Sequence, residues 1–160
     1  MHPNAQLIHD FYEAFKRGDA EGMVACYAPD VEFSDPVFKH LVGAEACGMW
    51  RMLLERPAGT KPKAEVAVSG IEADDESGKA QWGAAYTFSK TGRKVHNLVD
   101  ARFTFRDGKI IRHQDSFDLW SWMGQALGLS GKLLGWFPPF VQVVRRSAEG
   151  GLRDHLRKRA

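Results

Sequence analysis

The sequence has few cysteines and no long apolar run. Two cysteines, Cys26 and Cys47, occur among 160 residues. This is too few for a secreted disulfide scaffold, and we expect both thiols to be reduced. The longest apolar stretches fall far short of the roughly 18 residues of a membrane span. The chain starts without a basic segment followed by an apolar one, so we expect no signal peptide and, by default, a cytoplasmic protein.

Motifs for metal, phosphate and nucleic acid are also missing. His113 and Asp115 lie close together in the sequence, but no third ligand accompanies them, so we expect no metal site. No glycine-rich phosphate loop follows a predicted strand, and no Ser–His–Asp order stands out. No basic sheet face carries interleaved aromatic residues, as in single-strand binders. We therefore expect no cofactor and no nucleic-acid partner.

The composition is that of an ordinary soluble domain, with 44% hydrophobic and 26% charged residues. The length predicts a single domain able to bury about two-thirds of its unfolded surface. The net charge of +2 is uneven, because residues 145–160 carry six Arg or Lys against two acids. Such an end can meet nucleic acid or anionic lipid, but a solvated helix face is the commoner explanation.

The first third of the chain has the apolar periodicity of helices. We predict helices over residues 4–17, 20–28 and 43–55, with Asn4 and Asp19 as N-caps and Gly18 ending the first helix. A short strand over residues 31–35 ends at Pro36, which forces its predecessor into extended geometry. The residues that we expect on the buried helix faces are Leu7, Phe11, Phe15, Met23, Val24, Tyr27, Ala46, Trp50 and Leu53.

The middle of the chain alternates with the period of β-strands. We predict strands over residues 63–73, 80–90, 95–106 and 110–120, with a bulge at Ser69-Gly70 and a hairpin turn at Asp107-Gly108. Trp82, Ala84, Tyr86 and Phe88 share one face, as do Val99, Ala101, Phe103 and Phe105, and as do Ile111, His113, Asp115 and Phe117. The last of these faces is apolar at its ends and polar in its middle, which is the main chemical clue.

The last segment is helical and apolar. We predict a helix over residues 119–127, capped by Asp118, a short apolar piece over 131–136, a rigid corner at Pro138-Pro139, a helix over 140–146 and a frayed basic helix over 152–159. This divides the chain into a domain of residues 1–128 and an extension of residues 129–160. The apolar groups of the extension must cover the domain, pair with a second subunit or meet a membrane surface, in that order of expectation.

Four short segments resemble a known superfamily. They are residues 15–19 (FKRGD), 27–36 (YAPDVEFSDP), 43–45 (GAE) and 103–110 (FTFRDGKI). Together with the order of helices and strands, they resemble the nuclear-transport-factor-2-like superfamily over roughly residues 4–125. It includes SnoaL-like polyketide cyclases, ketosteroid isomerases and limonene epoxide hydrolases. The resemblance implies an α+β cone, with three N-terminal helices on the concave face of a curved antiparallel sheet and an apolar pocket between them.

The resemblance also implies roles for single residues. Asp35, before Pro36, resembles the general base of the ketosteroid isomerases, and Asp100 resembles their second aspartate. Strict alternation turns Asp100 away from Phe103, so only a bulge would bring it inside. The isomerases' oxyanion-binding tyrosine would fall at Phe11, one position before Tyr12.

Residues 112–119 resemble the last strand of the epoxide hydrolases. Their Arg-x-Asp partner would align with residues 82–84 (WGA), which cannot position water. In the SnoaL-like cyclases one aspartate deep in the cone serves an aldol-type closure. Asp115 beside His113 would fill that role.

We therefore take Asp35, Asp115 and His113 as candidate catalytic residues. The alternatives are that Asp35 caps the following turn and that Asp115 and His113 form a buried pair that fixes the sheet. Tyr12 or Tyr27 would donate a hydrogen bond to developing charge. The other candidate substrate-binding residues are Trp50, Trp82, Tyr86, Phe117 and Asp100.

Three functions follow from these candidates. The leading one is a cofactor-independent acid–base isomerase, cyclase or dehydratase on a hydrophobic small molecule of polyketide, terpenoid or steroid type. The second is a non-catalytic protein that holds such a ligand in the same pocket. The third is an interaction module that forms a homodimer through the outer sheet face. Contact of the tail with an anionic membrane is less favoured.

Overall fold

The computed structural model describes residues 1–134 and 138–159 and has the expected α+β class. The elements, in chain order, are α1 (Pro3–Arg17), α2 (Ala20–Val24), β1 (Tyr27–Ser34), β2 (Leu41–Val42), α3 (Ala44–Leu54), β3 (Glu65–Ala73), β4 (Ser77–Phe88), β5 (Arg93–Arg106), β6 (Lys109–Ser116), α4 (Leu119–Leu127), α5 (Leu129–Leu134) and α6 (Pro138–Arg159). No helix in these ranges is both long and apolar enough to cross a membrane.

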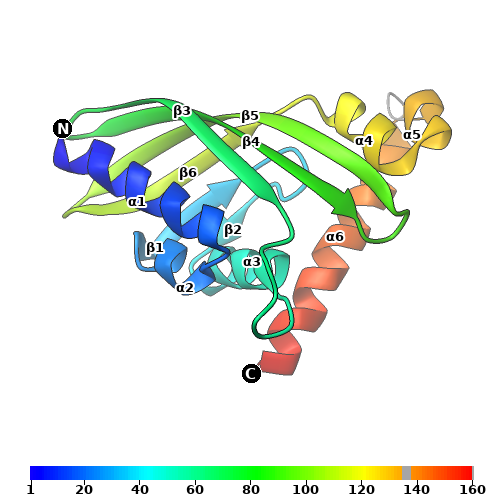
Figure 1. Cartoon of the computed structure of the whole chain (residues 1–160), viewed down its shortest axis with the longest axis horizontal. Coiled ribbons are helices and arrows are strands. Elements are labelled where there is room, and N and C mark those ends of the chain that lie inside the picture. The colour runs from blue at the N-terminus through cyan, green and yellow to red at the C-terminus, as the bar shows by residue number, and fades with distance from the viewer. Residues whose placement is uncertain (135–137, 160) are drawn as a thin grey trace.

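The strands form one curved, unclosed sheet in the order β2-β1-β6-β5-β4-β3. β3 to β6 form an antiparallel meander, whereas β1 pairs with β6 in parallel. Helices α1 and α3 lie on the concave side of the sheet (Figure 1). This arrangement confirms the predicted cone-shaped scaffold, and its parallel β1–β6 pair is a feature that the sequence pattern did not indicate.

The meander follows the predicted alternation most closely in β5. Val99, Ala101, Phe103 and Phe105 are all buried on the concave face. The predicted turn between β5 and β6 is confirmed, since Asp107 has φ 51° and Gly108 has φ 74°. A register shift between Ser69 and Glu72 confirms the predicted bulge in β3.

One alternation was predicted wrongly at the start of β6. The expected inward residue Ile111 is half-buried, whereas Ile110 is completely buried. A register shift between Thr104 and Phe105 of β5 changes which residues of β6 face inward at this end of the strand by one position. His113 and Asp115, beyond the irregular start, do face inward as predicted.

The N-terminal helices differ from the prediction in three places. The N-cap of α1 is His2, whose ring accepts from the Asn4 amide, while the Asn4 side chain donates to the carbonyl of Asp74 at 3.0 Å. The second helix ends at Val24, so Tyr27 begins a strand and does not belong to a helix face. Leu53 is 52% exposed on α3 and was wrongly placed in the buried stripe.

The C-terminal segment is more continuous than predicted. α4 has the predicted bounds, and Asp118 caps it by accepting from the Ser121 amide at 3.1 Å. The expected corner at Pro138-Pro139 is instead the first turn of α6. Proline is tolerated there because the backbone N–H groups of a first turn have no partner within the helix, so the N–H that proline lacks is not needed. α6 then runs through Gly150 without a break. Of the predicted apolar piece, residues 135 and 136 lie outside the described residues.

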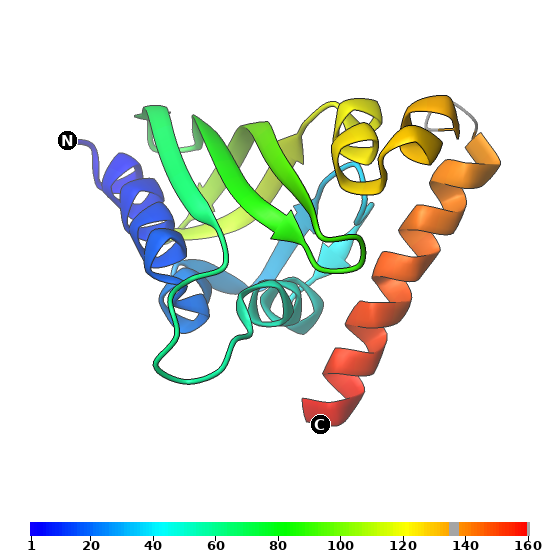
Figure 2. The same cartoon turned by 45° about the vertical axis from the view of Figure 1, so that its right-hand side comes forward.

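Contacts with the domain explain why α6 does not fray. Figure 2 shows α6 running beside α3 towards the C-terminus. Leu152 is 3% exposed, and Leu156 lies against the backbone of Gly48 on α3. The C-terminal half of α6 therefore packs on the domain. This tertiary packing offsets the low helix propensity of Gly150 and Gly151.

Candidate functional site

A chain of buried hydrogen bonds joins three elements beneath the sheet. Trp50 on α3 donates from Nε1 to the Tyr27 hydroxyl at 2.9 Å. The Tyr27 hydroxyl lies 2.7 Å from Nδ1 of His113, and Nε2 of His113 lies 2.8 Å from Oδ1 of Asp115. Trp82 Nε1 approaches the same oxygen at 3.4 Å. The chain therefore runs from the core helix to a carboxylate on β6.

The donors and acceptors fix the direction of this chain when the imidazole is neutral. Trp50 can only donate, so the Tyr27 oxygen accepts from it and uses its own hydrogen to donate. Nδ1 of His113 is then the acceptor, and Nε2 carries the hydrogen and donates to Asp115. The arrangement thus orients the Asp115 carboxyl group.

Side chains enclose His113 completely. Its exposed fraction is 0%, and its ring centroid lies 4.5 Å from that of Phe103, 5.1 Å from that of Phe33 and 5.4 Å from that of Phe11. A ligand that keeps this packing cannot touch the imidazole. His113 therefore acts on any ligand through Asp115.

The parallel pairing of β1 with β6 brings the two candidate acids together. Ser34 lies opposite Gln114, and the next residue on each strand is Asp35 and Asp115 respectively. Both acids line a hollow of about 460 Å³ at this end of the strands. The predicted convergence of the two carboxylates is therefore present, and it depends on a strand pairing between distant parts of the chain.

Asp35 lies in a turn that holds it by backbone groups. The amides of Val37 and Phe38 donate to its Oδ1 at 2.7 and 2.6 Å. Burial raises the pKa of Asp35 to about 6; the two amide bonds oppose the rise, and the charge of Asp115 adds to it. Asp35 caps its turn, as the alternative reading expected, and also has the pKa of a group that exchanges protons near neutral pH.

Both acids keep one oxygen for a ligand. The donors that reach Asp35 and those that reach Asp115 all approach Oδ1. Within residues 1–134 and 138–159, neither Oδ2 atom accepts a hydrogen bond. Each carboxyl group is therefore held through one oxygen, while the other has no hydrogen bond among the described residues.

The hollow is more polar than the predicted apolar pocket. Among its lining residues, only Pro36 and Phe117 are apolar. The others are Ser34, Asp35, Lys39, Arg102, Gln114, Asp115 and Ser116. Arg102 and Gln114 alternate towards the outer face, and Lys39 lies in a loop, so hydrophobic periodicity gave no reason to select them.

Five of the seven predicted substrate-binding residues fall into three groups. Tyr27 and Trp50 belong to the hydrogen-bond chain, and Phe117 lines the hollow. Trp82 and Tyr86 are half-buried on the concave face of β4, where the Tyr86 hydroxyl accepts from Trp122 at 2.7 Å.

Tyr12 and Asp100 lie at opposite extremes of burial. The Tyr12 hydroxyl is buried without a hydrogen-bond partner in the described residues, and burial raises the pKa of this phenol well above its usual value. Asp100 is exposed on the outer face, where Gln81 donates to it at 3.1 Å. The bulge that would have brought Asp100 inside is absent from β5, so Asp100 lies apart from the two buried acids.

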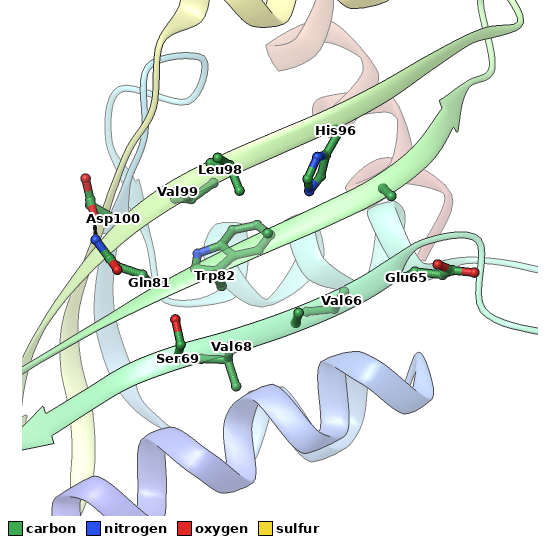
Figure 3. Close-up of a pocket in the computed structure, with 13 residues that line it drawn as sticks. Glu65, Val66, Val68, Ser69, Gln81, Trp82, His96, Leu98, Val99 and Asp100 are labelled. Atoms are coloured by element: carbon green, nitrogen blue, oxygen red, sulfur yellow. Dashed lines mark hydrogen bonds between the residues drawn. The ribbon is translucent and has the colours of Figure 1, made fainter.

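A second hollow, of about 620 Å³, lies on β3, β4 and β5 (Figure 3). One cross-strand row in it places Ala67 opposite Gly83 and Gly83 opposite Leu98. Leu98 is 69% exposed, and His96 and Asp100 flank it on the same strand. The Leu98 side chain lies over Gly83, so this row presents one large exposed apolar side chain.

Comparison with known proteins places this fold among related domains. A family model described as a SnoaL-like domain matches residues 8–113. No curated protein matches the chain. Among solved structures, a candidate polyketide cyclase from Xanthomonas campestris pv. campestris is 23% identical, with a TM-score of 0.63, over 77% of this chain and 96% of that one.

Two further solved structures share the scaffold. An LEH-like epoxide hydrolase from M. tuberculosis is 18% identical, with a TM-score of 0.60, over 85% of this chain and 96% of that one. A candidate ketosteroid isomerase from Kribbella flavida is 16% identical, with a TM-score of 0.56, over 72% and 78% of the two chains. Likeness at these identities concerns the fold, and the chemistry must be argued from the site.

Proposed function

Because this chain belongs to the SnoaL-like domain family, we propose that it is a cofactor-independent acid–base enzyme that isomerises, cyclises or dehydrates a small molecule. The observation that supports this most directly is the side-by-side placement of Asp35 and Asp115 at one hollow. The hydrogen-bond chain behind Asp115 adds to it. Two adjacent carboxyl groups in different surroundings are suited to taking and returning one proton.

The proposed roles follow from the surroundings of each acid. Asp115, which receives a hydrogen bond from His113 and so has a fixed orientation, takes the proton from the substrate. Asp35, with a pKa of about 6, is partly protonated near neutral pH and serves as the partner acid. A turnover leaves the proton on Asp115 and Asp35 without one, so a proton passes from Asp115 back to Asp35 before the next turnover, and in the reverse reaction the two roles exchange. General acid–base catalysis of this kind contributes about 10²–10⁴ in rate.

The proposed substrate has a ring or other apolar body and at least one oxygen next to an acidic C–H bond. Phe117 offers an apolar surface at the hollow, and Lys39 and Arg102 offer positive charge for developing oxyanion character. Polyketide-, terpenoid- and steroid-like carbonyl compounds share these features. Among the structural relatives, those named as a candidate polyketide cyclase and a candidate ketosteroid isomerase agree with this class.

Turnover of a simple carbonyl compound tests the proposal. The probe is 3-cyclohexen-1-one, whose isomerisation gives a conjugated ketone that absorbs in the ultraviolet. We expect Asp35→Asn and Asp115→Asn each to lower the rate at least about 100-fold. Asp10→Asn, which changes an exposed acid on α1, is the matched control and should retain the rate. If both of these variants turn over the probe at the wild-type rate, the two acids do not carry the chemistry.

A second candidate function is the binding of such a ligand without chemistry. The complete enclosure of His113 favours it, because the buried pair with Asp115 also stabilises the sheet when no proton moves. Incubation of the protein with a hydroxylated anthraquinone, followed by mass spectrometry, separates the two functions. Recovery of the intact ligand, bound but unchanged, favours the binding protein.

We also propose that two copies of the chain associate through the outer sheet face. Leu98 supports this, since it is a large apolar side chain that is 69% exposed on that face. A two-fold axis uses one patch on both subunits, so a single self-complementary row suffices.

A further inference from the structure

Helix α6 reaches back to the turn that holds Asp35. It begins at Pro138, beyond residues 8–113 that the family model matches. Arg145, half-buried on α6, donates from Nε to the Pro36 carbonyl at 2.8 Å. Pro36 is the residue that follows Asp35. One side chain of the extension thus contacts the backbone of the candidate site.

The position of Arg145 is set by the packing of the whole helix. Arg145, Leu152 and Leu156 lie on one helical face, because Leu152 follows Arg145 by about two turns and Leu156 follows it by about three. Leu156 contacts α3 so closely at Gly48 that a Cβ there would collide with it. His155 and Arg159 also approach Glu55 of α3, at 3.5 and 3.8 Å. The contact of Arg145 with Pro36 therefore belongs to a docked helix and not to a free side chain.

The Pro36 carbonyl is linked directly to a donor on Asp35. This carbonyl and the Val37 N–H belong to one peptide group, and that N–H donates to Asp35 Oδ1 at 2.7 Å. The turn is closed a second time by the Asp35 amide, which donates to the Phe38 carbonyl at 2.8 Å. A cationic donor on the carbonyl polarises the peptide and strengthens its N–H as a donor.

We propose that Arg145 is a positioning residue for Asp35, and that α6 completes the candidate site by fixing the Asp35–Phe38 turn. The inference rests on the proposed role of Asp35 as a proton carrier. It adds a part of the chain that the domain alone does not contain. In this arrangement Arg145 touches no substrate and acts through the backbone of the turn.

Other charged groups also face Asp35 and must stay constant in a test. Asp115 raises the pKa of Asp35 and His113 lowers it, both from β6. Lys39 and Arg102 line the same hollow from the loop and from β5. A substitution on α6 leaves all four in place, so its effect reports on the contact with Pro36.

The test measures the titration of Asp35 without any substrate. Nuclear magnetic resonance of the ¹³C-labelled Asp carboxyl groups follows Asp35 in wild type, Arg145→Met and Arg146→Met. Arg146 is the exposed neighbouring residue, and its replacement removes the same positive charge. We expect Arg145→Met to move the midpoint of Asp35 upwards by about 0.5 on the pH scale, because weaker amide donation disfavours the carboxylate. Arg146→Met should leave it unchanged.

Further variants separate positioning from general structure. Arg145→Gln keeps a neutral donor for the Pro36 carbonyl and should give an intermediate midpoint, and this variant replaces Arg145→Met should the latter unfold. Turnover of 3-cyclohexen-1-one should fall roughly threefold to tenfold in Arg145→Met, the size of one hydrogen bond.

The readouts also separate this inference from the proposed function. Equal midpoints in wild type, Arg145→Met and Arg145→Gln overturn the inference, whatever the turnover. A moved midpoint in a protein that turns over no probe keeps Arg145 as a positioning residue and counts against the proposed chemistry.

Discussion

The Tyr27 hydroxyl lies 2.7 Å from Nδ1 of His113, across 86 positions of sequence. This contact sets the tautomer of the imidazole and so decides which nitrogen meets Asp115. It also links the strand that starts the sheet with the strand that ends the meander. Changes at Tyr27 should therefore affect both stability and the acid pair.

Tyr27→Phe should lower the free energy of unfolding by about 1–3 kcal/mol. The substitution leaves Nδ1 of His113 and Nε1 of Trp50 buried without a partner, and each loses the hydrogen bond that offset its desolvation. Urea unfolding measures the change. Tyr86→Phe is the control, because that hydroxyl has one partner and is only partly buried. Equal losses for the two variants would contradict the special role of Tyr27.

Asp35 should make the stability of the protein depend on pH in an unusual direction. Its folded pKa, about 6, lies above the ordinary value of 3.8. Between these values the folded state binds more protons than the unfolded state, so stability falls as the pH rises. The burial of the charged form therefore costs stability above pH 6, by at most about 3 kcal/mol from the size of the shift.

Asp35→Asn should remove this dependence. The Asn side-chain oxygen can still accept from Val37 and Phe38, while no charge forms. Urea unfolding of both proteins at pH 4 and pH 7.5 gives the comparison, and the carboxyl groups remote from Asp35 cancel in the difference. The variant should gain stability relative to wild type at the higher pH. A difference that is the same at both pH values would show that Asp35 has an ordinary pKa.

Leu98→Asp should convert a dimer into a monomer. In the dimer the new carboxylate would be buried in the interface, beside the cross-strand row of Ala67 and Gly83. Burying an unpaired charge there costs enough free energy to abolish association. Sedimentation velocity measures the mass in solution. Leu53→Asp is the control, since Leu53 is also an exposed leucine but lies on α3. A wild-type protein that sediments as a monomer, or a Leu98→Asp dimer, would refute association through this face.

Gly48→Val should loosen helix α6. A side chain at Gly48 collides with the Leu156 side chain, which must then leave its present packing position against α3. We expect a loss of about 1–3 kcal/mol, as in other overpacked contacts. Hydrogen exchange of the α6 amides would show whether the loss is local to that helix.

The matched control for Gly48→Val is Gly151→Ala. Gly151 lies on α6 with open space around it, so a methyl group meets nothing. Alanine there should stabilise the helix by up to about 1 kcal/mol, from propensity alone. Opposite signs for these two glycines, one on each of the packed helices, would confirm the docking of α6. Equal, small effects would indicate that Leu156 does not pack on α3 in solution.

Local signals predicted much of the sheet. The alternation of Val99 to Phe105 gave the buried face of β5, and Asp107-Gly108 gave the turn after it. These features depend on neighbours in sequence, where the period of two and positive φ values are strong constraints. The inward direction of His113 and Asp115 followed from the same period.

Non-local contacts account for what the sequence did not predict. Tyr27 continued the helical spacing of the residues before it, and only the pairing of β1 with β6 extends it as a strand. Separate helices were predicted over residues 140–146 and 152–159, but packing of Leu152 and Leu156 on α3 carries one helix through the glycines between them. The polar hollow combines Lys39, Arg102 and Gln114 from separate elements, and no local pattern marks them.

The parallel joining of β1 to β6 has a consequence for how the protein assembles. A parallel pair cannot form as a hairpin, and closing the long intervening loop costs more entropy than closing any turn of the meander. The meander can zip from one local turn to the next, whereas the acid pair waits for the N-terminal strand to dock along its edge. We therefore expect Asp35 and Asp115 to become neighbours late in folding, after the meander has formed.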